Sequence, residues 1–190
     1  MSTEQTINSI FNHLSSLHRS IASRRKSGVD EQVVVEKLSS RGLYCHKDFL
    51  EVYRLCNGTS THKGDVLDQI QFFPGYYWMD FEEALTTYDA LASSENWSKA
   101  WFPVFASGGG DFYCVICDKD SRDFGAIVGF ILGESDHLVE FKSMKTFLET
   151  IDRSFLEGAF FAKDGFLEAD YSKMRVISRG LQLDFVPHDA

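Results

Sequence analysis

Apolar residues recur at three- and four-residue steps in several stretches of this chain, a spacing that places them on one face of a helix. Polar residues suited to begin a helix precede most of these stretches, with Asp30, Asp80 and Ser143 as the clearest examples. Gly28 and Gly180 stand where the first and last helices are expected to stop. The pattern predicts helices over residues 3–26, 30–40, 47–56, 80–92, 143–155 and 170–179.

The centre of the chain has a different pattern, in which short apolar runs are separated by turn residues. An isolated run at 66–73, followed by Pro74 and Gly75, predicts one strand and a turn. Short connections between the later runs favour an antiparallel meander. These later strands are predicted over residues 102–106, 111–118, 124–132 and 138–141.

Helices first, strands next and helices last is the order of an α+β fold. We predict an antiparallel meander sheet of about four to six strands, with helices packed mainly on one face. The chain is divided into a helical arm at residues 1–29, an α+β core domain at 30–160, and a helical extension at 161–190 packed on that core.

The net charge of the chain limits the kinds of partner that it can bind. The chain carries 28 acidic and 19 basic residues, a formal net charge of −9. This sign opposes binding to nucleic acid or to an anionic membrane surface, and it permits a cationic protein partner. The polar N-terminus, the absence of a long apolar run and only four cysteines predict a cytoplasmic protein with reduced thiols.

Cys114 and Cys117 form the most suggestive chemical motif, but they lie inside a predicted strand. Because side chains alternate along a strand, residues three apart face opposite sides of the sheet. The two sulfurs are therefore expected to point apart, which favours structural cysteines over a redox pair or a thiol enzyme.

Two further candidate sites are also better explained as structure. A zinc site would need four residues whose spacing matches no compact zinc motif: Cys45, His46, Cys56 and His62. The Gly108–Gly110 run lacks the Lys-Ser/Thr ending of a phosphate loop, so a tight hairpin is expected there. We predict no catalytic residues, no metal site and no cofactor.

Residues 65–96, which we call the acidic span, contain seven acidic residues and no lysine or arginine. Residues 1–29 are the basic part of the chain, with four basic residues and one acidic residue. Aromatic side chains within an acidic field are typical of an interface with a basic protein, although an acidic helix face above an aromatic core gives the same pattern. The predicted partner-binding residues are Asp65, Asp68, Tyr76, Tyr77, Trp78, Asp80, Glu82, Glu83 and Asp89.

Residues 48–58 form a predicted helix that ends in Asn-Gly, and residues 101–118 form a predicted hairpin with a Gly-Asp turn. In this order, the two stretches resemble the corresponding helix and hairpin of the SUKH superfamily. Residues 124–129 and 141–151 resemble the following strand and the closing helix. The resemblance covers about residues 30–155. The superfamily includes bacterial immunity proteins and a yeast cell-wall-assembly regulator.

The resemblance implies an α+β fold and a non-enzymatic role. The expected function is that of an immunity protein that binds and neutralises a cognate toxin with a basic surface, such as a nuclease. The alternative is a regulatory scaffold of the cell-wall-regulator type. A monomer and a homodimer are both compatible with the sequence.

Overall fold

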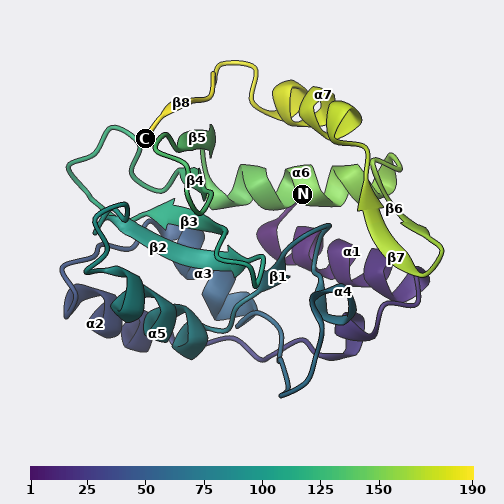
Figure 1. Ribbon diagram of the computed structural model, residues 1–190, viewed down its shortest axis with the longest axis horizontal. Helices are drawn as coiled ribbons and strands as arrows, with labels where there is room; N and C mark the ends of the chain where they lie inside the picture. The colour runs from purple at the N-terminus through teal and green to yellow at the C-terminus, as the bar shows by residue number, and fades with distance from the viewer.

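The computed structural model describes residues 1–190 and contains one large sheet, a small hairpin and helices at both ends of the chain (Figure 1). The helical segments are α1 (Thr3–Ser16), the 3₁₀ turn η1 (Ser20–Ser23), α2 (Glu31–Ser39), α3 (Lys47–Leu55), α4 (Leu67–Ile70), α5 (Phe81–Leu91), α6 (Met144–Leu156) and α7 (Tyr171–Leu181). The strands are β1 (Tyr77–Trp78), β2 (Trp101–Ala106), β3 (Phe112–Ile116), β4 (Ile127–Phe130), β5 (Leu138–Phe141), β6 (Phe160–Lys163), β7 (Phe166–Ala169) and β8 (His188–Asp189).

The large sheet has the strand order β1-β2-β3-β4-β5-β8, and every neighbouring pair is antiparallel. Strands β2 to β5 form the predicted meander, while the two-residue strands β1 and β8 lie at its edges. The α+β prediction is therefore confirmed. The hairpin β6–β7 forms a separate two-stranded sheet.

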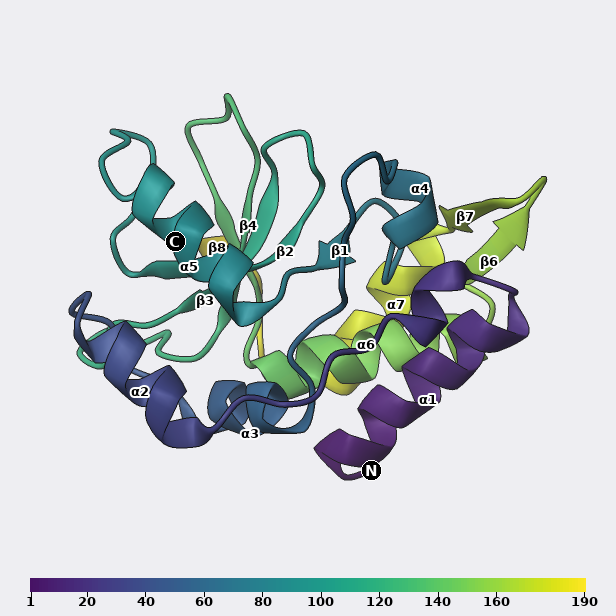
Figure 2. The ribbon, with the colours of Figure 1, turned by 90° about the horizontal axis from the view of Figure 1, so that it is seen from below.

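One face of the large sheet lies over the main helical layer, where α1, α3 and α6 run side by side (Figure 2). The main core joins apolar residues of these helices to one face of the strands, for example Leu14, Phe49, Phe147 and Phe102. A smaller cluster fills the opposite face around Trp97, Trp101, Cys114 and Phe130. The end of α5, the segment after it and the C-terminal tail pack against this second cluster through Leu91, Ala100 and Phe185 respectively.

The first helix is shorter than predicted. It ends at Ser16, and His18 adopts the left-handed conformation (φ 56°) before the 3₁₀ turn that buries Ile21. Ile21 continues the apolar spacing of the helix, but the chain has already turned, so periodicity alone misplaced its end. Ile7, Ile10 and Leu14 lie in the main core, so the predicted arm shares its core with the central domain. The three-part domain division remains a prediction.

The strand predicted at 66–73 is wrong. The structure has the single-turn helix α4 there, and the nearby edge strand is β1. Phe72 and Phe73 are adjacent and both buried, which a strand with only one buried face would not allow. The last helix differs slightly, since α7 passes through Gly180 and ends at Leu181. None of the helices combines the length and the apolar character that crossing a membrane requires.

Candidate protein-binding surfaces

The acidic helix α5 is held in place by the Asn57-Gly58 pair. The Asn57 side-chain oxygen accepts a hydrogen bond from the Phe81 N–H at 2.7 Å. Asp80 caps the same helix by accepting from the Glu83 N–H at 2.9 Å. Gly58 has φ 63°, and a Cβ there would lie 2.4 Å from the Met79 carbonyl oxygen. This close approach explains why glycine follows Asn57.

Residues 19–30, which we call the strap, lie across the acidic span. Their backbone pairs with the segment after α3, where Lys26 donates to the Gly58 carbonyl and Ser60 donates to that of Arg24. The strap side chains form ion pairs at 3.2 Å, 2.5 Å and 2.6 Å, respectively Arg19–Asp68, Arg24–Asp65 and Lys26–Asp80.

Two further basic residues pair with the exposed side of α5. Lys37 lies 2.6 Å from Glu82, and Arg41 donates two hydrogen bonds of 2.7 Å to the carboxylate of Asp89. Of the two remaining acidic residues of the span, Glu83 accepts a hydrogen bond from the Tyr77 hydroxyl at 2.7 Å. The other, Glu95, is exposed and forms no ion pair.

These contacts show that most acidic residues of the span are paired with basic residues from elsewhere in the chain. Five of the seven acidic residues in the span have a basic partner, supplied by residues 41 to 54 positions away in the sequence. Hydrogen bonds from Arg24 and Arg41 hold the pKa values of Asp65 and Asp89 below their ordinary range. Burial raises the pKa of Asp80, but the contacts with Lys26 and the Glu83 N–H outweigh it, so the net direction is down.

The predicted aromatic contacts are corrected in part. Trp78 is 0% exposed and packs between Tyr53, Phe72 and Phe105, so it is a core residue that no partner can reach. Tyr76 and Tyr77 are only half-buried. A binding role for them and for the paired acids remains a prediction.

Cys114 and Cys117 are buried in the apolar clusters of the fold. Cys114 lies in the smaller cluster and Cys117 in the main core, so the prediction that they face opposite sides of the sheet is confirmed. Burial raises the pKa of both thiols well above the ordinary value, which keeps them protonated and unreactive.

The residues of the other two candidate sites have roles in the fold. His46 caps α3 through its Nδ1, and the Cys56 thiol donates to the Gly58 carbonyl. Gly108 and Gly110 have φ 73° and 108° in the predicted β2–β3 hairpin.

A second acidic surface lies on the opposite face of the sheet. It is a hollow of about 400 Å³, and neither lysine nor arginine is among the residues that line it. We call it the acidic hollow; its charged and aromatic lining consists of Glu95, Asp136, Asp189, Trp97, Trp101 and His137. None of its three acidic side chains forms an ion pair.

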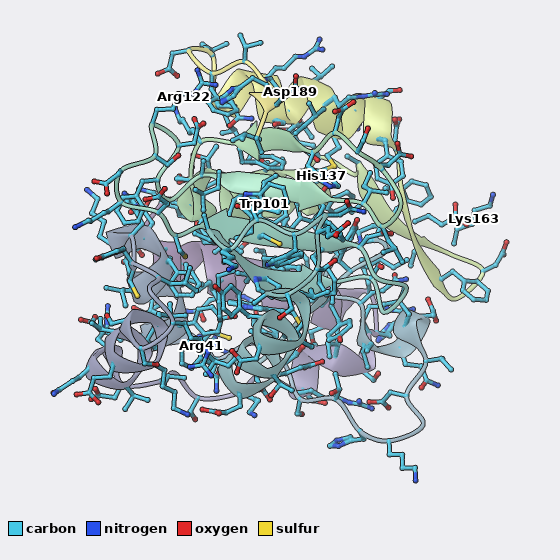
Figure 3. All side chains as sticks on the ribbon, turned by 60° about the vertical axis from the view of Figure 1, so that its left-hand side comes forward. Arg41, Trp101, Arg122, His137, Lys163 and Asp189 are labelled. Carbon is cyan, nitrogen blue, oxygen red and sulfur yellow. The ribbon has the colours of Figure 1, made fainter.

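The hollow is built by the stretch from Glu95 to Trp101, by residues 135–137 and by the C-terminal tail that carries Asp189. Trp97 lies in the loop after α5, Trp101 begins β2, and His137 directly precedes β5. The Trp101 and His137 rings meet edge to face at 5.3 Å, and these side chains lie on the sheet face below Asp189 in Figure 3. His137 is only 7% exposed, and its Nδ1 accepts a 3.5 Å hydrogen bond from the Ile131 N–H.

The chemistry of the hollow suits a cationic group. Carboxylates at its rim attract lysine or arginine side chains, and aromatic rings next to them add cation–π attraction. Local sequence patterns do not reveal this site, because Asp136 and Asp189 are far from Glu95 along the chain. The sole sequence signal of this site is the pair of tryptophans Trp97 and Trp101. Periodicity does not distinguish them from ordinary core residues.

Residues 37–150 match the model of the SMI1 / KNR4 family (SUKH-1), which is more than half of the chain. The chain belongs to this family. The SUKH superfamily includes immunity proteins as well as the cell-wall regulator, and it is non-enzymatic. A search of curated proteins finds no match to this chain. The matched region contains the acidic span and most of the hollow, whereas the strap and α7 lie outside it.

Proposed function

We propose that this SUKH family member is an immunity-type protein that binds a toxin and neutralises it without chemical catalysis. The supporting observation is the acidic hollow, where three carboxylates lack ion-pair partners and surround an aromatic floor. A surface of this kind can recognise a basic loop around the active site of a toxin. Binding there would exclude the substrate of the toxin.

Charge and aromatic packing have different roles in this proposal. Glu95, Asp136 and Asp189 accelerate the encounter with a basic partner, an effect that weakens as salt rises. Trp97 and Trp101 are only 5% and 7% exposed, so they supply a small apolar contact once the complex forms. In contrast, the ion pairs of the acidic span leave less charge available to a partner.

The proposal is tested by co-expression with the toxin encoded by a neighbouring gene. The wild-type protein should restore growth, and E95Q/D136N/D189N should restore it less well. A matched control, E36Q/D120N/E168Q, removes three exposed carboxylates that lie outside the hollow and form no ion pair. The control should protect like the wild type. A toxin that is neither bound nor neutralised by the wild-type protein would refute the proposal.

The regulatory-scaffold alternative is distinguished by the same experiment. It is favoured by membership of the family named for the SMI1/KNR4 regulators. A scaffold would show no rescue, and its partners would be cellular proteins encoded away from this gene.

A further inference from the structure

A second cavity, which shares no lining residue with the acidic hollow, lies between α7 and the large sheet. It has a volume of about 450 Å³, within the size range of small-molecule sites. Strands β3 and β5 contribute Tyr113 and Glu140, and α7 contributes Tyr171, Arg175 and Arg179. Figure 1 shows α7 above α6, next to the edge of the sheet that carries β5 and β8.

Glu140 is a half-buried carboxylate without a cationic partner. It forms no ion pair, although the chain has 19 lysines and arginines. Burial raises its pKa, and the neighbouring Tyr113 hydroxyl acts in the opposite direction. Enclosing a carboxylate without a cation is unfavourable, so its retention points to a binding role.

The neighbouring strand leaves space for this carboxylate. A Cβ at Gly129 would lie 2.4 Å from the Glu140 Oε1, closer than any real side chain could approach. Gly129 lies in β4, next to β5, and its φ is negative or extended, so turn geometry does not account for the glycine. The absence of a side chain at Gly129 therefore leaves room for the Glu140 carboxylate in its observed position.

The rim of the cavity has the opposite charge. Arg175 and Arg179 are one helical turn apart on α7, and both are exposed. They are the two arginines, of nine in the chain, whose side chains form neither an ion pair nor a hydrogen bond. Two free guanidinium groups at one opening are suited to an anionic group.

Part of the cavity lining is apolar. Phe141, Met174 and Phe185 add apolar surface to the same cavity. A ligand that satisfies the whole lining therefore carries a cation, an anion and apolar groups.

We propose that this cavity binds a short zwitterionic peptide of about two residues with apolar side chains. Its ammonium group contacts Glu140 and Tyr113, and its carboxylate contacts Arg175 and Arg179. The proposal is independent of toxin binding, because it concerns a different cavity built partly by a helix outside the family match.

Calorimetry with the full chain and the dipeptides Leu-Phe and Phe-Leu tests this site. At least one should bind more tightly than about 1 mM. Acetylating its N-terminus or amidating its C-terminus should each weaken binding about tenfold, because each removes one charged contact. No binding by either dipeptide, or equal binding of the blocked and free forms, would overturn the proposal.

Variants of the protein then identify the residues that bind each end of the dipeptide. E140Q keeps the shape of the side chain and should remove the preference for a free N-terminus. R175Q/R179Q should remove the preference for a free C-terminus. The matched control R153Q changes an arginine on α6 that is paired with Glu157, and it should bind like the wild type. Thermal unfolding of each variant verifies that it is folded, and unchanged selectivity in a folded E140Q would contradict the assignment.

Discussion

The two acidic surfaces of this protein contain similar residues but differ in what surrounds them. In the acidic span, five carboxylates contact basic residues of the strap and of the α2 region. In the acidic hollow, three carboxylates have no such partner and face a partly enclosed aromatic floor. The first arrangement stabilises the fold, and the second leaves negative charge available to another molecule. The local density of acidic residues in a sequence therefore does not show which part of the surface presents negative electrostatic potential to a partner.

The docking of the strap can be disrupted at Gly28. A Cβ at this position would lie 1.7 Å from the Arg54 carbonyl oxygen, which is backbone and cannot move aside easily. We expect Gly28→Ala to lower the free energy of unfolding by about 3 kcal/mol. Urea denaturation measures this loss.

Gly180→Ala is the matched control for this substitution. Nothing lies within 4 Å of the Cβ position at Gly180, and the residue is within α7. Alanine should be neutral or stabilise by up to about 1 kcal/mol. Equal stability of the Gly28→Ala and Gly180→Ala variants would show that the strap is not tightly docked.

Single carboxylates from the two surfaces should differ in their effect on stability. Asp80 caps α5 and pairs with Lys26, so Asp80→Ala should cost about 1–2 kcal/mol. Asp189 is exposed and has no ion pair, so Asp189→Ala should change stability by less than about 0.5 kcal/mol. Chemical denaturation of both variants checks the difference, and a larger loss for Asp189→Ala would reverse the roles assigned to the two surfaces.

The pH dependence of stability should reveal a smaller difference between variants of the two surfaces. The pKa values of Asp65, Asp80 and Asp89 are lower in the folded protein than their ordinary values. Such groups stabilise the fold above the unfolded pKa of about 3.9, and this stabilisation is lost as the pH falls through the lower folded pKa. D65N/D80N/D89N should thus be less stable than the wild type at neutral pH, with the difference shrinking towards about pH 2.

The hollow variant E95Q/D136N/D189N is the control for this titration. It removes no ion pair, so its stability should follow the wild-type curve between neutral and acid pH. A stability deficit of D65N/D80N/D89N that persists unchanged in acid would mean that its cause is packing rather than charge pairing.

Local patterns predicted much of the fold. The cap at Asp80, the strand meander and the opposite orientation of Cys114 and Cys117 follow from helical spacing and strand alternation. The ion pairs of the strap could not be predicted in this way, because Lys26 and Asp80 are 54 residues apart. Trp78 was misplaced for a related reason, since a buried aromatic residue and an interface aromatic residue have the same local sequence signal.

The most direct test is the association rate of the toxin with the two variants at low and high salt. We expect E95Q/D136N/D189N to bind about tenfold more slowly at low salt and to lose most of its salt dependence. D65N/D80N/D89N, once shown to be folded, should associate at nearly the wild-type rate. Slow association of the D65N/D80N/D89N variant together with an unchanged rate for the hollow variant would show that the acidic span, and not the hollow, attracts the toxin.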